Sequence, residues 1–486
     1  MATDPAAPPE TQQPAGTRTV PTRVRREIRI RRKKSRRGPL RKLRRRLETL
    51  TPESVAASID RIIQAVLVAL LALAPLPLGS VAPWARSIVF AATASLFFLW
   101  ILKGSVLGRI EIVQTRIWGL LALYVCILFF QLLPLPHAFL SVLSPKTSDL
   151  YARLIPGYPE EASFMPLSLN PHATVQEILR VSSLFLLFFV LVNHLRDRSR
   201  VNFFLWVLAA LGLFEALYGL GERFSGNPHI FWIPPPDRES VRGTYYNRNH
   251  FAGLMEMLTP AVCGLLMSLV AARQRASWRR SRLSFGRRLT EGLSKASTYR
   301  NLLLGLLVAA MFVAGCLSLS RGAILGLVSG FFVLLLFAAG RGGDPSGRRR
   351  LPAAAVAAVL IVVAGLLLYR GMTPLIDRFE QLAEEDSSLS GRAALRTAGL
   401  AMIRDFPALG AGGGAFGDVF HAYQPGRYGD KIAVYLHNDW LQVPCETGLA
   451  GALTLYGALA IFLVQILRRI AGRKDSYCRF VFAGAF

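Results

Sequence analysis

Three short polar motifs carry the residue types that could bind and transfer a charged group. They are SVRGTYYNRNHFAGLMEM (residues 240–257), SLSRGA (318–323) and HNDWLQVPCETG (437–448). Their charged and titratable candidates are Arg242, Arg248, His250, Arg321 and His437, with Asn438 beside the last histidine. A guanidinium group stays charged and can hold a phosphate through two hydrogen bonds. A histidine can take up a proton near neutral pH, so the set predicts a site for an anionic ligand such as a diphosphate.

Each motif also has a simpler interpretation. Arg242 and Arg248 could be ordinary charges at a helix end, with their head groups reaching water. A lone histidine is more often structural than catalytic, although the polar neighbours of His437 favour a functional role. Arg321 is harder to explain in this way, because it lies between two apolar runs with no acidic residue nearby. Burying an arginine there requires an anion, and a substrate phosphate would serve.

A long polar segment, residues 370–447, follows the second motif further along the chain and includes nearly all of the third. Residues 370–446 hold ten acidic and seven basic side chains, whereas the whole chain has a net charge of +27. This contrast indicates that the segment faces a different compartment from the rest. Residues 391–405 predict an amphipathic helix, and Arg392 and Arg396 lie one turn apart on its polar face as further substrate-binding candidates. Glycines 410, 412, 413 and 414 then allow a turn that packs closely or approaches a phosphate.

Apolar runs of membrane-spanning length make up much of the remaining chain, of which 52% is hydrophobic. They predict an all-α polytopic integral membrane protein. The ten predicted spans are residues 62–80, 86–102, 117–134, 176–194, 202–220, 250–271, 302–319, 322–340, 352–369 and 448–467. The segment SYCRFVFAGAF at the end reads as the start of an eleventh span, which gives about 10–11 helices. Several prolines predict irregular structure with short helices between residues 135 and 175.

The basic residues suggest how the spans are oriented. Residues 18–46 contain sixteen lysines and arginines, and a span follows soon after. Such a tail is typical of a segment that contacts anionic lipid, so we expect no nucleic-acid partner. If the tail is cytoplasmic, every even-numbered connection is rich in Lys and Arg, as the positive-inside rule predicts. The predicted domains are a disordered basic cytoplasmic tail (1–50), amino-terminal transmembrane helices (51–220), a transmembrane core with an external loop at 370–447 (221–467), and a basic cytoplasmic end (468–486).

The motifs, taken in order, resemble the O-antigen ligase and polymerase family of bacterial inner-membrane proteins. The resemblance rests on RGTYYNRNHFAG, SLSRGAILGL, the GAGGGAF run after DFPAL, and HNDWLQ with ETGLAG. It covers most of the chain from the fourth span onward. It implies a glycosyltransferase related to the GT-C architecture, with a large periplasmic loop and the amino terminus in the cytoplasm.

The resemblance also implies the substrates and the roles of the residues. The donor would be a glycan on undecaprenyl diphosphate, and the acceptor a sugar hydroxyl on lipid A core or on another lipid-linked repeat. Arg242 and Arg321 would bind the diphosphate and stabilise the leaving group, and His437 would accept the proton of the acceptor hydroxyl. Arg248 and His250 lie close enough to Arg242 to substitute for it. The membrane lipid surrounds the enzyme, and we expect no cofactor and no metal requirement.

Three other functions stay open at this point. A protein O-glycosyltransferase of the same family would use a protein side chain as acceptor. A transporter of anionic solutes would explain the spans and the arginines, but its site should lie near the midplane of the bilayer between repeated halves. A membrane scaffold would depend mainly on the basic tail. Because no convincing internal repeat is present, glycosyl transfer is the preferred function.

Overall fold

The computed structural model describes residues 51–278, 296–339, 386–424, 433–472 and 481. Contacts divide the chain into residues 1–51 and 52–486, and all described helices and strands belong to the second unit. The predicted basic tail and the predicted span 352–369 lie outside the described residues.

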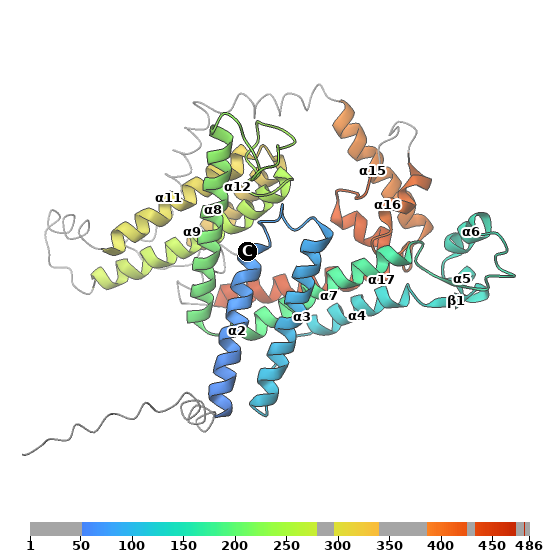
Figure 1. The fold of residues 1–486 in the computed structure, drawn as a ribbon, viewed down its shortest axis with the longest axis horizontal. Coiled ribbons are helices and arrows are strands. Elements are labelled where there is room, and N and C mark those ends of the chain that lie inside the picture. Colours follow the sequence, from blue (N-terminus) through green and yellow to red (C-terminus); the bar gives the residue numbers. More distant parts are fainter. Residues whose placement is uncertain (1–50, 279–295, 340–385, 425–432, 473–480, 482–486) are drawn as a thin grey trace, which may run out of the picture. The chain divides into compact units, whose positions relative to one another are not determined.

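Helices dominate the described part of the chain (Figure 1). The longer ones are α2 (Pro52–Leu73), α3 (Pro83–Val106), α4 (Ile117–Phe130), α7 (Pro171–His194), α8 (Arg198–Phe224), α9 (Arg248–Trp278), α11 (Ala296–Leu317), α12 (Arg321–Ala339), α15 (Asp386–Asp405) and α17 (Asp439–Gly472). Seven of them are long and apolar enough to cross a membrane, and α4 and α12 contain shorter apolar helices. These nine overlap nine of the ten predicted spans, so the prediction of an all-α polytopic membrane protein is confirmed.

Several span boundaries differ from the prediction, and the first and third spans are examples. The first predicted span, 62–80, is replaced by α2, which begins at Pro52 and ends at Leu73. Proline suits the first turn of a helix, whereas Pro75 and Pro77 cannot donate the N–H groups that would extend it. The third predicted span, 117–134, ends early because α4 stops at Phe130.

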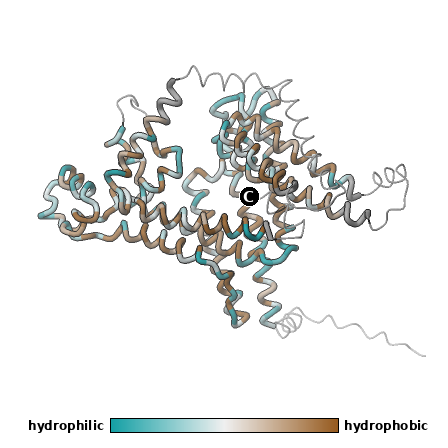
Figure 2. Tube along the Cα trace, turned by 180° about the vertical axis from the view of Figure 1, so that it is seen from behind, coloured by the Kyte–Doolittle hydropathy of each residue, from teal (hydrophilic) through white to brown (hydrophobic). Residues whose placement is uncertain are grey.

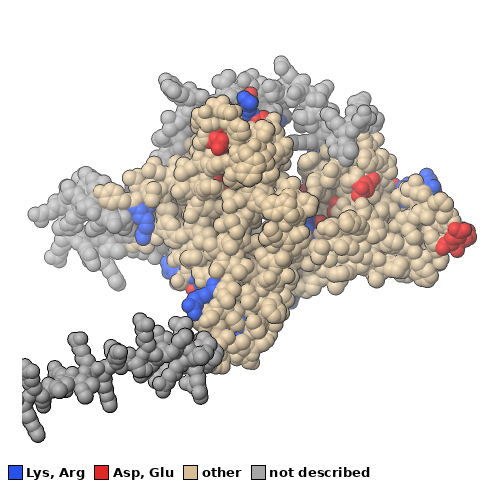
Figure 3. All heavy atoms as spheres, in the orientation of Figure 1, with Lys and Arg blue, Asp and Glu red and all other residues tan. Residues whose placement is uncertain are grey.

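The outer surface of the helices is largely apolar. Phe98 on α3, Leu302 on α11 and Leu453 on α17 are all more than half exposed. Hydrophobic residues run along the helices, while many of the hydrophilic ones lie in the connections (Figure 2). Charged side chains are sparse on the face shown in Figure 3. Apolar surface of this extent is expected where helices contact lipid.

One group of helices, α8, α9, α11 and α12, encloses the largest buried apolar cluster. Within it, α9 and α12 run in the same direction. A Cβ atom added at Gly326 would lie 1.7 Å from Glu256 Oε1, and one at Gly330 would lie 2.9 Å from Pro260 Cγ. The contact moves four residues further along both helices, from Glu256 to Pro260 on α9 as from Gly326 to Gly330 on α12. The amino-terminal ends of α9 and α12 therefore lie at the same end of the pair.

A second group contains α2, α3, α4, α7 and α17. Helix α3 packs against both α2 and α7, and α4 packs against α7 and α17. The rings of Trp100 on α3 and Phe189 on α7 meet edge to face with centroids 4.9 Å apart. This pairing fixes α3 and α7 side by side, which matters below because both helices reach two different cavities.

The polar segments form two small units. Between α4 and α7, strand β1 (Pro134–Pro136) pairs antiparallel with β2 (Phe164–Pro166), and α5 (His137–Leu143) and α6 (Pro145–Leu154) lie between them. In the second unit, Leu395 and Met402 on α15 are buried, as predicted for its apolar face. They pack in one cluster with residues of α16 (Phe416–Val419) and of the 3-10 helix η1 (Phe420–Tyr423).

Candidate functional site

A cavity of about 1010 Å³ lies where both helix groups meet the polar segment. Side chains from α3, α7, the start of α9, residues 414–421 and residues 434–446 line it. Two of the predicted site residues, His250 and His437, are among them. The structure therefore brings together the first and third sequence motifs, which are far apart along the chain.

His437 is presented by a strained turn at the start of α17. Its φ is 56°, in the left-handed region that residues other than glycine rarely adopt, and its side chain is exposed. Leu436 is buried on one side, and its N–H donates to Gln442 Oε1 over 3.1 Å. On the other side the carbonyl of Asn438 accepts hydrogen bonds from the first turn of the helix. Strain of about 1–3 kcal/mol persists only where surrounding contacts enforce it, and such residues cluster at functional sites.

The rest of the third motif follows one face of α17. Asp439, Gln442 and Glu446 are spaced by three and four residues and all line the cavity with His437. Gln442 Nε2 donates to Glu446 Oε1 over 3.0 Å, and the N–H of Gly414 donates to Glu446 Oε2 over 2.9 Å. Sequence reasoning quoted this motif but gave no role to Gln442 or Glu446. Their helical spacing from Asp439 was the signal that identifies them.

A break in α17 holds this wall in place. Gly448 has φ 62° and ψ −169°, which is not helical. The N–H groups of Leu449 and Ala450 donate instead to the carbonyls of Pro407 and Ala408, over 2.9 and 3.2 Å. In an unbroken helix those two N–H groups would donate to the carbonyls of Cys445 and Glu446. Here these carbonyls accept hydrogen bonds from the glycine-rich loop instead. These bonds are Ala411 N to Cys445 O, 2.9 Å, and Gly412 N to Glu446 O, 3.0 Å.

Gln131 at the end of α4 completes this junction. Its side chain is fully buried; Nε2 donates to the carbonyls of Leu409 and Glu446, and Oε1 accepts from the N–H of Gly413. The sequence allowed the glycine run to be either a closely packed turn or a turn that approaches a phosphate. These contacts show a closely packed turn. Only Gly414 of that run lines the cavity.

Two arginines that sequence reasoning missed also line the cavity. Arg86 lies on α3 and Arg180 on α7, where Arg180 pairs with Glu177 through Nε and Oε2 at 2.7 Å. Both arginines are exposed to solvent. The signal for Arg180 was a charged pair inside an otherwise apolar span, since such residues are rare and mark functional positions.

Arg242 is held in a different way. It is only 5% exposed, and its Nη2 lies 2.5 Å from Asp237 Oδ2. The same guanidinium donates to Ser240 Oγ and to the carbonyl of Tyr246. Burial opposes the ionisation of Asp237, but hydrogen bonds from Ser240 and Arg242 outweigh it and lower its pKa to about 2. Arg242 does not line the cavity; among the described contacts it supports the loop that precedes α9.

Arg248 and Arg321 are the first residues of α9 and α12, so they lie at the same end of two parallel helices. Arg248 Nη1 is 3.7 Å from Asp237 Oδ2, and Arg321 is half-buried. The N–H of Val241 donates to the carbonyl of Leu317 over 2.9 Å, which joins the segments that carry the first two motifs. The structure thus brings the first and second motifs together, although neither Arg248 nor Arg321 lines the large cavity.

The other candidates are more dispersed. Asn438 is half-buried between two residues that line the cavity, while Arg396 is exposed on α15 and does not line it. The side chain of Arg392 lies outside the described residues. No group of three or more metal-ligating side chains occurs in the described part of the chain.

Comparison with family models gives a match to part of the chain. Residues 306–456 match a family model described as O-antigen ligase. The matched range contains the second and third motifs and the cavity wall from Gly414 to Glu446, whereas the first motif lies outside it. No curated protein and no solved structure matches the chain.

Proposed function

We propose that this chain, a member of the O-antigen ligase family, transfers a glycan from undecaprenyl diphosphate to an acceptor hydroxyl within the large cavity. Family membership supports glycosyl transfer by a membrane enzyme in general terms. The observation that carries the finer proposal is the meeting of His437 and His250 with two arginines in one cavity. The periplasmic face, the bacterial inner membrane and the cytoplasmic amino terminus belong to the same proposal.

His437 acts as the general base in the proposed reaction. The acceptor oxygen forms a bond to the anomeric carbon of the donor glycan as its proton passes to the His437 imidazole. The bond between that carbon and the diphosphate oxygen breaks, and undecaprenyl diphosphate leaves with the electron pair. A positioned base typically contributes about 100- to 10,000-fold to such a step.

Arginines neutralise the charge that develops on the leaving diphosphate. Arg86 and Arg180 line the cavity. Arg248 and Arg321 begin the parallel helices α9 and α12, of which α9 reaches the cavity through Asn249 and His250. Donors that are already oriented toward a developing charge stabilise the transition state more than the ground state. The role of Arg242 that the resemblance implies is then supportive, because its guanidinium is bonded to Asp237 and Ser240.

The acidic wall of the cavity suits a hydroxyl-rich acceptor. Asp418, Asp439 and Glu446 supply oxygens that accept hydrogen bonds, and Gln442 adds an amide. Such groups recognise sugar hydroxyls equally well on a lipid A core or on another lipid-linked repeat. A protein side chain is the third acceptor class, and it corresponds to a protein O-glycosyltransferase.

The test uses membranes that contain the full chain, a lipid-linked glycan and an acceptor. His437→Ala and Arg321→Ala should abolish the glycosylated product while both variants reach the membrane at wild-type level. Arg153→Ala, at an exposed position of α6, is the control and should retain transfer. Wild-type product from both site variants would rule out this assignment.

A transporter of anionic solutes is the second candidate, because a broken helix such as α17 is a common feature of transporter sites. In this chain, however, the backbone groups at the break bond to residues 407–412 instead of facing a solute. Solute flux in proteoliposomes without any glycosylated product would favour the transporter. Deletion of residues 1–50 addresses the scaffold alternative, since an enzyme should keep its transfer activity without the tail.

A further inference from the structure

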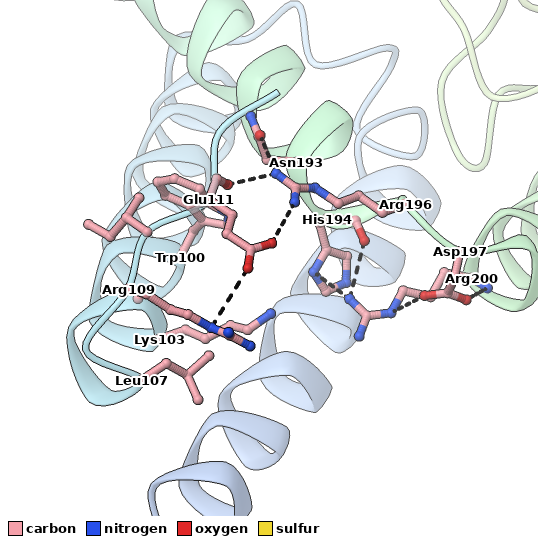
Figure 4. Close-up of a pocket in the computed structure, with 12 residues that line it drawn as sticks. Trp100, Lys103, Leu107, Arg109, Glu111, Asn193, His194, Arg196, Asp197 and Arg200 are labelled. Atoms are coloured by element: carbon pink, nitrogen blue, oxygen red, sulfur yellow. Dashed lines mark hydrogen bonds and ion pairs between the residues drawn. The ribbon is translucent and has the colours of Figure 1, made fainter. Parts of the chain in front are cut away.

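A second cavity, of about 260 Å³, lies at the ends of α3 and α7 opposite those that line the large cavity. Figure 4 shows the residues that line it. On α3, Arg86 lines the large cavity and Lys103 the small one; on α7, Glu177 lines the large cavity and Asn193 the small one. At 1.5 Å per residue the two sites are about 25 Å apart along each helix. The hydrocarbon core of a bilayer is about 30 Å thick. The small cavity therefore lies toward the membrane face opposite the large one.

Cationic side chains converge on the small cavity from three elements. Lys103 comes from α3, Arg109 from the connection after it, and Arg196 and Arg200 from the region around the start of α8. Both connections are among those that the charge pattern assigns to the cytoplasm. The acidic groups bonded to these cations are Asp60, Glu111 and Asp197, so the cations outnumber them. Arg109 is the most weakly held, 3.7 Å from Glu111 and 74% exposed.

His194 adds a buried donor that has no acceptor. The residue is 2% exposed and lines the cavity. Its Nδ1 lies 3.2 Å from Nη1 of Arg200, which can only donate, and 3.5 Å from Oδ1 of Asp60. The shorter contact favours the tautomer in which Nδ1 accepts from Arg200 and the proton is on Nε2. Among the described residues, Nε2 has no hydrogen-bond partner. A buried donor without an acceptor is costly, so a ligand oxygen at this position would satisfy it.

We propose that the small cavity binds a phosphate group at the face of the membrane opposite the large cavity. A phosphate supplies the acceptor that His194 lacks and the negative charge that the surplus of cations requires. Its oxygens can accept from Arg109 and Arg196 at the same time, as guanidinium groups favour. The apolar lining of Leu107, Ile110 and Trp100 leaves room for the glycerol end of a phospholipid beside the head group.

The site does not depend on the function proposed above. A phosphate held there would brace the ends of α3 and α7 whose other ends form the transfer cavity. The phosphate could belong to an anionic lipid of the adjacent leaflet or to a soluble phosphate ester. Both sources present the same oxygens to His194 and the arginines, so the experiment must separate them.

The experiment measures lipid binding to the purified full chain in detergent by native mass spectrometry. The probes are phosphatidylglycerol, a glucosyl diacylglycerol that has no phosphate, and inorganic phosphate as a competitor. Arg109→Gln should weaken phosphatidylglycerol binding about tenfold, because one charge-assisted hydrogen bond is lost. His194→Phe should weaken it similarly, whereas Arg153→Gln, an exposed arginine on α6, should bind like wild type. Because Arg109 is exposed, its variant keeps the fold even if the His194 variant does not.

The outcomes separate the sources. Displacement of the lipid by inorganic phosphate identifies a site for the phosphate group itself, and its persistence identifies a lipid site; either result supports the proposal. Binding of phosphatidylglycerol and phosphate to Arg109→Gln as tightly as to wild type would overturn it. Equal affinity of the wild type for the phosphate-free glycolipid would also overturn it.

Discussion

Gly448 and Ala408 approach each other so closely that a Cβ atom on Gly448 would lie 2.3 Å from the carbonyl carbon of Ala408. The positive φ of Gly448 excludes other residues as well. Gly448→Ala should therefore break the exchange of hydrogen bonds between α17 and the glycine-rich loop. We expect a loss of about 2 kcal/mol or more in the free energy of unfolding. The thermal unfolding temperature in detergent and the rate of glycan transfer should both fall.

The same helix provides a matched control. A Cβ on Gly457 would meet only Leu120 at 3.8 Å, an ordinary contact. Gly457→Ala should therefore leave thermal unfolding unchanged or raise its midpoint slightly, because alanine favours the helix. Equal loss of stability in both variants would contradict the structural role of the break.

His437→Gln tests proton transfer separately from binding. The variant keeps a polar side chain at the cavity but loses the titratable group, so turnover should fall about 100-fold or more. The Michaelis constant for the lipid-linked donor should change little, since the diphosphate contacts arginines. Kinetics of the purified enzyme provide the measurement, with His229→Gln outside the cavity as control. An unchanged turnover number would show that His437 is not the base.

Asp237 predicts a pH dependence of stability. Its pKa in the folded chain is lowered to about 2 from an ordinary value near 3.8, mainly through Ser240 and Arg242 against the cost of burial. The ionised carboxylate therefore stabilises the fold above about pH 4, and this stabilisation is lost as the pH falls toward about 2. Asp237→Asn should lower the unfolding temperature at pH 5 to about 7 and flatten its decline in acid. Asp149→Asn, at an exposed ion pair, is the control and should keep the wild-type acid profile.

Most of the fold could be predicted from local hydropathy. Nine apolar helices lie where the sequence predicted spans, because about 20 apolar residues in a row have few other stable arrangements. The boundary of α2 was wrong, since hydropathy does not register that Pro75 and Pro77 end a helix and that Pro52 can begin one. The small pairing of β1 with β2 depends on contacts between distant residues and had no local signal.

The candidate site was only partly accessible from the sequence. Motif chemistry predicted that His250 and His437 belong to one site, and both line the cavity. The sequence did not show that Arg242 lies outside this cavity. Its partner Asp237 precedes it in a loop, where no regular spacing indicates the ion pair. Arg86 and Arg180 come from helices that looked like plain membrane spans. Their place in the cavity depends on how α3 and α7 pack, which no single segment encodes.

Arg86 and Arg180 provide the last prediction, since both were identified only from the cavity. Each is exposed, so Arg86→Gln and Arg180→Gln should fold normally and leave the unfolding temperature unchanged. If they hold the donor diphosphate, each change should raise the Michaelis constant for the lipid-linked glycan about tenfold, as one charge-assisted contact is lost. Glu177→Gln releases Arg180 from its ion pair without removing the guanidinium, so donor affinity should be kept or improved. A loss in Glu177→Gln equal to that in Arg180→Gln would instead make the pair a structural brace of α7.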